Sequence, residues 1–343
     1  MSVAIRETQN LFAKFDKNQD GYISKDEFEE GCRTFFHDDI ALRELLLQNN
    51  DDSLFRHAIS GDVDYITWSM LLSPRHLPYI TPNCRNTSGP LAQATPTDHE
   101  LELMERMFAR GHTLAASASA HGTRLLMDAE QSRVQPAIDN LVLDLQRTFN
   151  APSTENNTIP IVYNTYQCYL TDSLERLQWD IQRAERFEYA FGAKLVRGAY
   201  MESERQEATS IGRDSPIHAT KEATDACYDA AVDYMLQKVA SNNTSMELML
   251  ATHNQESIET AIQGMNRHGI DRRNPSVSFG QLLGMMDNLT FGLGRHGYRA
   301  YKYVPYGEVK MVMVRKFSSK NAQSASHVCL SPPSTALPHT SSE

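Results

Sequence analysis

One stretch of this sequence decides the fold: Gly192-Ala193-Lys194-Leu195-Val196-Arg197-Gly198-Ala199-Tyr200. Its front half is apolar and ends in the β-favouring Val196, which predicts a short buried strand. Charged residues follow where the strand ends, first Arg197 and then Glu202 and Glu204. A strand that ends in charged side chains is typical of the catalytic mouth of a parallel α/β barrel. A strand end with solvated charges fits this stretch alone equally well.

The same pattern recurs five more times along the chain. Apolar runs that lead into polar or aromatic residues occupy positions 123–127, 159–163, 248–251, 277–279 and 301–304. Helical stripes separate most of these runs, and the alternation of strands with helices predicts a (βα) barrel. Six clear strands, with a weak seventh at 290–292, fall short of the eight that a TIM-like (βα)8 barrel needs. We therefore predict an α/β fold with an incomplete barrel.

Bulk properties exclude several classes of protein. The 343 residues suffice for one barrel and a smaller module, and 41% of them are hydrophobic, enough for a core. A net charge of −10 argues against a nucleic-acid partner, and no apolar run approaches membrane-spanning length. The five cysteines are scattered without a CxxC pair, which predicts reduced thiols in an intracellular compartment. We find neither a signal peptide nor an Arg-rich transit segment at the N-terminus.

Residues 16–27 match the calcium-binding loop of an EF-hand. Oxygen ligands stand at the first, third, fifth, seventh, ninth and twelfth positions of the loop, namely Asp16, Asn18, Asp20, Tyr22 through its backbone, Ser24 and Glu27. Gly21 supplies the sharp turn at the sixth position. Calcium prefers such oxygen ligands, so the loop predicts a Ca²⁺ site. The alternative is a charged helix-turn-helix that binds no metal.

A second, metal-free loop is expected at 61–68. In this interpretation Ile66 forms the short β-bridge to Ile23 of the first loop, which puts Met70 where the bidentate Glu belongs. The chain then divides into an EF-hand-like helical module at 1–72, a proline-rich linker at 73–97 and a barrel at 98–310. Residues 311–343 are expected to form a divergent, disordered tail, because Ser, Pro and Thr are frequent there.

A glycine motif near the end of the barrel invites a wrong assignment. Residues 292–297 spell GxGxxG, the fingerprint of a dinucleotide site. Such a site requires a strand before the motif and a helix after it. Here a strand-like run, 298–303, follows the motif instead, so we interpret these glycines as a turn.

Six strings of residues, in order, resemble the proline dehydrogenase family. They are Leu126-Met127-Asp128-Ala129-Glu130-Gln131, Asn164-Thr165-Tyr166-Gln167-Cys168-Tyr169, Lys194-Leu195-Val196-Arg197-Gly198-Ala199-Tyr200, Ala251-Thr252-His253-Asn254, Phe279-Gly280-Gln281-Leu282-Leu283-Gly284 and Tyr301-Lys302-Tyr303-Val304-Pro305-Tyr306-Gly307. The resemblance covers roughly residues 101–307. It implies a barrel flavin enzyme that uses FAD to oxidise proline to 1-pyrroline-5-carboxylate and passes the electrons to a quinone.

The resemblance also implies roles for individual residues. The FAD contacts are expected at Gln167, Arg197, Glu202, Thr252, His253 and Gln281. Tyr303 resembles the tyrosine that packs on the substrate, and Asp128 and Glu130 resemble acidic residues that organise the site. From the residues alone, His253 also fits a structural hydrogen bond at a strand end. The Asp128–Glu130 pair equally suits a metal or an ion pair.

Two departures from the family pattern stand out. The family carries Tyr-x-x-Arg-Arg-x-x-Glu after the last strand, with two arginines for the substrate carboxylate, and here those places hold Arg315, Ser318, Ser319 and Ala322. The family's first barrel strand, upstream of the calcium module, has no counterpart after Met1. We therefore expect a form of the family shortened at its start, with an unrelated end and impaired turnover.

Location and alternative functions complete the expectations. The resemblance implies a mitochondrial protein on the matrix side of the inner membrane, associated peripherally with it. A calcium-binding protein without turnover is one alternative. The other is an unrelated barrel lyase or aldolase that uses Lys194 or Lys302 as a Schiff base, although neither lysine stands at a clear strand exit.

Overall fold

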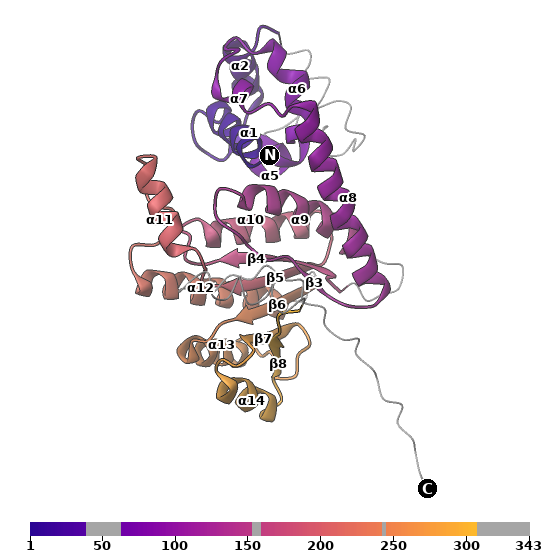
Figure 1. Cartoon of the computed structure of the whole chain (residues 1–343), viewed down its shortest axis with the longest axis vertical. Coiled ribbons are helices and arrows are strands. Elements are labelled where there is room, and N and C mark those ends of the chain that lie inside the picture. The colour runs from indigo at the N-terminus through magenta and orange to yellow at the C-terminus, as the bar shows by residue number, and fades with distance from the viewer. Residues whose placement is uncertain (39–62, 153–158, 242–244, 307–343) are drawn as a thin grey trace. The chain divides into compact units, whose positions relative to one another are not determined.

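A computed structural model describes residues 1–38, 63–152, 159–241 and 245–306 of the chain. The chain divides into two compact units, Met1–Ala109 and Arg110–Glu343 (Figure 1). The expected tail at 311–343 and the departures at 315–322 lie outside the described residues. Each unit is considered by itself below.

The first unit contains the expected EF-hand. Helix α1 (Ser2–Phe15) leads into the loop, and helix α2 (Lys25–Phe35) follows it. Strand β1 (Tyr22–Ile23) of the loop pairs antiparallel with β2 (Val63–Asp64). Ser24 caps α2, accepting a hydrogen bond from the backbone of Glu27, whose side chain accepts one from the backbone of Ser24 in return.

The partner of Ile23 in this bridge is Val63, and the expectation of Ile66 was wrong. Ile66 lies one turn further on, buried in helix α5 (Tyr65–Leu71). The helix begins there because the Asp64 side chain accepts a hydrogen bond from the Thr67 backbone N–H at 2.9 Å. With Val63 at the eighth loop position, Thr67 rather than Met70 takes the place of the bidentate Glu. Neither residue offers a carboxylate.

The segment expected as a linker carries short helices with prolines in their first turns. They are η1 (Pro74–His76), α6 (Leu77–Ile80), η2 (Thr81–Asn83) and α7 (Pro90–Gln93). Leu77, Ile80 and Cys84 are buried in the same apolar cluster as Phe15 and Trp68 of the EF-hand. The prolines of this segment therefore punctuate packed helices. Helix α8 (Asp98–Ala120) follows, with Thr97 accepting a hydrogen bond from the Glu100 N–H at 3.3 Å.

The second unit is built on one parallel sheet of six strands, in the order of the chain (Figure 1). The strands are β3 (Leu125–Leu126), β4 (Val162–Gln167), β5 (Phe191–Val196), β6 (Met246–Ala251), β7 (Val277–Leu282) and β8 (Arg299–Tyr303). Each strand pairs in parallel with the next, so the sheet curls as a half-barrel. This confirms the prediction of an α/β fold with an incomplete TIM-like barrel.

Helices connect the strands and pack on one face of the sheet. They are α9 (Gln135–Phe149), α10 (Ser173–Arg186), α11 (Met201–Ser210), α12 (Lys221–Ser241), α13 (Gln255–Arg267) and α14 (Asp287–Arg295). The expected weak strand at 290–292 is part of α14, because a short apolar run does not distinguish strand from helix. Gly292 and Gly294 are helical as well, so the turn is confined to His296 and Gly297. Strand β8 does follow the glycine motif, as expected.

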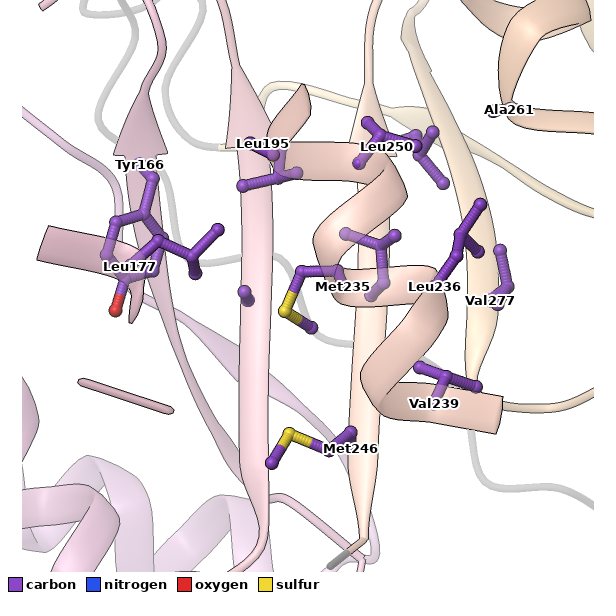
Figure 2. Close-up of a cluster of buried hydrophobic side chains, with 14 of the residues drawn as sticks. Tyr166, Leu177, Leu195, Met235, Leu236, Val239, Met246, Leu250, Ala261 and Val277 are labelled. Atoms are coloured by element: carbon purple, nitrogen blue, oxygen red, sulfur yellow. The ribbon is translucent and has the colours of Figure 1, made fainter. Parts of the chain in front are cut away.

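The main core lies between the sheet and its helices (Figure 2). Leu195 and Leu250 from the strands meet Leu177 of α10 and Met235 and Leu236 of α12 in one buried cluster. Because side chains alternate along a strand, the residues between these project from the opposite, inner face of the sheet. Lys194 is one of them.

The inner face carries charged groups near the amino ends of the strands. Arg124 Nη2 lies 2.8 Å from Glu247 Oε1, and the Tyr163 hydroxyl donates to the other Glu247 oxygen. Glu247 is 7% exposed, so its charge needs these partners. In a parallel barrel this end of the sheet serves stability, and the carboxyl ends of the strands carry the chemistry.

Candidate active site at the carboxyl ends of the strands

The residues expected in the barrel site gather at one edge of the sheet. Asp128 and Glu130 follow β3, Gln167 ends β4, Arg197 follows β5, Thr252 and His253 follow β6, Gln281 lies in β7, and Tyr303 ends β8. Since all six strands are parallel, their carboxyl ends meet at this edge. The pattern that the sequence showed is thus a spatial cluster.

Asp128, Lys194 and Tyr303 form the centre of this edge, which we call the strand-end triad. Lys194 Nζ forms an ion pair with Asp128 Oδ1. The Tyr303 hydroxyl donates to Asp128 Oδ2 at 3.3 Å. The triad ties the first described strand of the barrel sheet to the third and the sixth. Asp128 is therefore anchored by a cation on one oxygen and a phenol on the other.

Lys194 was missed as a site residue by the sequence analysis. It stands in the middle of an apolar strand and is only 8% exposed. A lysine so deeply buried requires a partner, and the Asp128 carboxylate supplies it. The position of a lysine at an alternate place between Ala193 and Leu195 was the available signal.

The loop after β3 is held through its backbone. Gln167 Nε2 donates to the Glu130 carbonyl at 2.7 Å, and the Glu130 N–H donates to Gln135 Oε1 at 2.8 Å. The Ser132 N–H donates to Glu204 Oε1 at 2.6 Å. Glu204, on α11, is 2% exposed and was not predicted as a site residue. These contacts fix the main chain that carries Asp128.

Arg197 is fastened to two helices and a neighbouring strand end. Its Nε lies 2.6 Å from Asp225 Oδ1 on α12. Its Nη1 donates to Thr252 Oγ1 and its Nη2 to Ser257 Oγ on α13, both at 2.8 Å. The guanidinium carbon also lies 4.5 Å from the centre of the Tyr228 ring. We call this group the Arg197 anchor.

The anchor leaves Arg197 able to bind a further group. A guanidinium has five N–H donors, and the contacts given for the described residues use three of them. Asp225, Ser257 and Tyr228 were missed because they lie on helices whose pattern indicates only core. Gly198 allows the chain to leave the strand here: its φ is +139°, and a Cβ would lie 2.2 Å from the Tyr169 ring.

Thr252, His253 and Gln281 are joined by hydrogen bonds. Gln281 Nε2 donates to the Thr252 carbonyl at 3.3 Å, and its Oε1 accepts from the Thr290 hydroxyl at 2.8 Å. His253 Nε2 accepts from the Leu282 N–H at 3.0 Å, which places the ring proton on Nδ1. Burial, and then the charge of Lys302, lowers the pKa of His253 below its ordinary value. The imidazole is therefore a neutral acceptor at this edge.

Glu202 does not share these contacts. It lies in the first turn of α11 with its side chain exposed, while Glu204 two residues on is buried. The sequence placed both carboxylates at the strand exit, but consecutive alternate positions of a helix face different directions.

The EF-hand loop is organised around its carboxylates. Asp16 Oδ2 accepts from the Gly21 N–H at 3.0 Å, and Asp20 Oδ1 accepts from the Tyr22 N–H at 2.9 Å. Asn18 Oδ1 accepts from the Asp20 N–H at 2.9 Å. Gly21, with φ of +89°, makes the turn that only glycine adopts readily.

Glu27 closes this loop from its far end. Its Oε2 accepts from the Ser24 N–H at 3.0 Å, and its Oε1 accepts from the Lys17 N–H at 3.0 Å. The Ser24 backbone, foremost among these donors, lowers the pKa of Glu27 to about 2. Among the described residues, no three His, Cys, Asp or Glu side chains stand together in a metal-holding arrangement. Glu27 would exchange amide partners for an ion that enters the loop.

Two family models match the chain. The model of proline dehydrogenase matches residues 41–318, and the model of the EF hand domain matches residues 7–35. The first match covers most of the chain and includes every residue of the strand-end triad and the Arg197 anchor. An unrelated lyase or aldolase is thereby excluded.

Curated relatives agree with the family model. The chain is 41% identical over 261 residues to the human protein named proline dehydrogenase 1, mitochondrial, covering 74% of this chain and 42% of that protein. The Caenorhabditis elegans protein of the same name is 32% identical over 326 residues, 91% of this chain and 50% of that protein. The bovine hydroxyproline dehydrogenase is 38% identical over 245 residues, with shares of 71% and 51%. The chain thus spans about half the length of these relatives.

Solved structures show the same fold at lower identity. Proline utilization A from Bdellovibrio bacteriovorus, inactivated by N-propargylglycine, superposes with a TM-score of 0.55 at 22% identity, over 64% of this chain and 22% of that one. A variant of proline utilization A from Bradyrhizobium japonicum gives a TM-score of 0.53 at 21% identity, over 66% and 22%. These likenesses concern the barrel fold.

Proposed function

The chain belongs to the proline dehydrogenase family, and from this premise we propose that it carries out the FAD-dependent oxidation of L-proline to 1-pyrroline-5-carboxylate. One observation carries the proposal. The strand-end triad and the Arg197 anchor bring a carboxylate, a phenol and two cations to the carboxyl edge of a parallel sheet. A small zwitterionic substrate and an anionic cofactor need such groups, and this edge is where parallel barrels place them.

The donors at this edge fit a flavin. FAD supplies the hydride acceptor that no side chain provides. Arg197 has N–H groups to spare beside its three protein contacts, so it can donate to the cofactor and balance negative charge. Gln167, Thr252, His253 and Gln281 line the same edge, and we assign the cofactor contacts to them with Arg197. Glu202 joins this group only from the exposed face of α11.

Asp128, Glu130 and Tyr303 are assigned to the substrate. The Tyr303 ring ends β8 and its hydroxyl is fixed by Asp128, so the ring has a defined face for the pyrrolidine to pack on. Lys194 holds Asp128 in place from the neighbouring strand. In this arrangement the carboxylate orients the substrate and Lys194 keeps that carboxylate from turning away.

Electron acceptor and location follow the family. We assign the electrons to a quinone and the protein to mitochondria, on the matrix side of the inner membrane and peripherally associated with it. The curated human, bovine and Drosophila relatives are named mitochondrial. No helix in the described part of the chain is long and apolar enough to cross a membrane.

Calcium is assigned to the first loop of the EF-hand. Asp16, Asn18, Asp20 and Glu27 offer side-chain oxygens, and Tyr22 offers a backbone carbonyl. The β1–β2 bridge holds the loop as in other EF-hands, and Gly21 makes its turn. The second loop lacks a carboxylate at its twelfth position, which is Thr67, so one Ca²⁺ per chain is proposed.

A flavin titration tests the function. Protein purified in excess FAD and freed of unbound cofactor should be yellow, and anaerobic L-proline should bleach the flavin band. The same titration with trans-4-hydroxyproline distinguishes the substrate named for the hydroxyproline dehydrogenase relatives. A protein that retains FAD but is bleached only by hydroxyproline would replace the proposed substrate, and a folded protein that retains no flavin would overturn the proposal.

A further inference from the structure

Two thiols face each other behind the flavin edge, outside the groups described so far. Cys168 directly follows β4, and its backbone N–H continues the ladder by donating to the Val196 carbonyl at 2.8 Å. Cys227 lies on α12 and packs against the same core cluster that contains Cys168. The two side chains are hydrogen-bond partners. The fold thus brings together two cysteines that are far apart in the sequence.

Their surroundings are unequal. Cys168 is fully buried, with the Ser173 hydroxyl 3.9 Å from its sulfur, while Cys227 is partly exposed. The hydrogen bond from Cys168, followed by that from His218, lowers the pKa of the Cys227 thiol to about 6, against the opposing effect of burial. The same contact and burial raise the pKa of Cys168. Near neutral pH, Cys227 is the thiolate and Cys168 keeps its proton.

This asymmetry matches the division of labour in a reactive thiol pair. A thiolate with a pKa near the ambient pH combines a large ionised fraction with good nucleophilicity. A partly exposed thiolate meets a small oxidant first, and a buried neighbouring thiol then resolves the oxidised sulfur. Cys227 has the first set of properties and Cys168 the second.

We propose that Cys227 and Cys168 form a site of reversible oxidation by hydroperoxides. The Cys227 thiolate attacks the O–O bond of hydrogen peroxide and becomes a sulfenic acid, while hydroxide leaves. The Cys168 sulfur then attacks the Cys227 sulfur, a disulfide forms, and water leaves with the Cys168 proton. The two thiols lose two electrons and the peroxide gains them. A dithiol reductant reverses the change by thiol–disulfide exchange.

The position of the pair connects it to the cofactor edge. Cys168 directly follows Gln167, and the Tyr169 N–H donates to the Arg197 carbonyl at 2.6 Å. Cys227 precedes Tyr228, whose ring lies under the Arg197 guanidinium. Drawing the two sulfurs together therefore shifts both walls of the Arg197 anchor. This last step rests on the proposed flavin function, and the oxidation itself does not.

The chain offers internal controls. Cys32 and Cys84 are both buried in the first unit, and burial raises the pKa of Cys84. They should remain thiols at peroxide concentrations that oxidise Cys227. Cys329 lies outside the described residues, so a Cys329→Ser background removes it as a source of other disulfides.

The test is mass spectrometry of the chain, in the Cys329→Ser background and without added flavin, after exposure to hydrogen peroxide. We expect one disulfide-linked peptide pair, Cys168 with Cys227, that dithiothreitol reverses. Cys168→Ser should stop at a sulfenic acid on Cys227 that a cyclic diketone captures, and Cys227→Ser should leave Cys168 reduced. Cys84→Ser should behave as the parent.

Circular dichroism of each variant establishes that it is folded before oxidation. Folded Cys227→Ser in which Cys168 is oxidised as fast as in the parent would overturn the proposal. So would a parent chain in which Cys227 stays a thiol, or keeps a sulfenic acid without linking to Cys168. Because apoprotein is used, a chain that binds no flavin would leave these results unchanged.

Discussion

At the scale of single residues, the site depends on charges that the fold has already paired. Asp128 meets a lysine from one strand and a tyrosine from another, and Arg197 meets a carboxylate and two hydroxyls. Each side chain a ligand would use is thus oriented before the ligand arrives, which is the property that electrostatic catalysis requires.

The Lys194–Asp128 ion pair gives the first prediction. Asp128→Ala leaves the ammonium of Lys194 buried without its carboxylate, and breaking a buried pair costs about 3–5 kcal/mol. We expect the free energy of unfolding in urea to fall by about 3 kcal/mol, the lower end of that range, because the Asp128 side chain is 16% exposed. Adding Lys194→Met should restore part of the loss. A single variant as stable as the parent would show that the pair carries no such role.

Arg197 gives the second prediction. Arg197→Ala removes a charged donor beside a cofactor that carries negative charge, so FAD affinity should fall by about 1.5–3 kcal/mol in a fluorescence titration. Ser257→Ala is the matched control, since it removes one contact of the Arg197 anchor and leaves the guanidinium in place. We expect a smaller loss from this control. Equal affinities for parent and Arg197→Ala would remove Arg197 from the cofactor site.

His253 gives a prediction about pH. Its pKa is lowered in the folded chain from the ordinary value of 6.5, so the unfolded chain binds the proton more readily. The stability contributed by neutral His253 is therefore fully present above pH 6.5 and is lost as the pH falls through the folded pKa. Proton NMR of the imidazole should show titration below 6.5 in the folded chain and near it in urea. Titration above 6.5 in the folded state would contradict the burial of this ring.

At the scale of elements, the EF-hand loop gives the fourth prediction. Calorimetry should detect one Ca²⁺ per chain, because the second loop has Thr67 where a bidentate carboxylate is needed. Glu27→Gln should weaken binding severely by removing the bidentate ligand. Glu30→Gln, a change of the same charge on the exposed side of α2, should leave binding intact. Two tight sites, or none in the parent, would disprove this assignment.

The elements also show where sequence patterns suffice. Apolar runs followed by polar residues predicted all six strands, because burial and alternation act within a few residues. The same local rules failed where a cap or a turn decides the outcome. Asp64 starts a helix two residues before Ile66, so Val63 makes the bridge instead, and Thr290 lies in a helix although it is β-branched.

The candidate site divides along the same line. Residues at strand exits were predictable because parallel strands bring their ends together. The partners of Arg197 were not, because Asp225 and Ser257 approach it from helices that lie 28 and 60 residues further along the chain. Such contacts depend on how helices pack on the sheet, which a single sequence does not reveal.

At the scale of the whole molecule, a half-barrel of six parallel strands carries the triad and the Arg197 anchor on one edge. An EF-hand unit of the same chain carries the calcium loop, and the redox pair lies behind the cofactor edge. The chain spans about half the length of its curated relatives, so its own catalytic capacity is the central question.

Anaerobic reduction of bound flavin by L-proline tests that claim most directly, because it needs neither a quinone nor a membrane. The flavin band of the parent chain should bleach on addition of proline, and Tyr303→Phe and Asp128→Ala should slow the bleaching while FAD stays bound. Flavin that remains oxidised in excess proline, in a parent chain shown to be folded and loaded with FAD, would contradict the account.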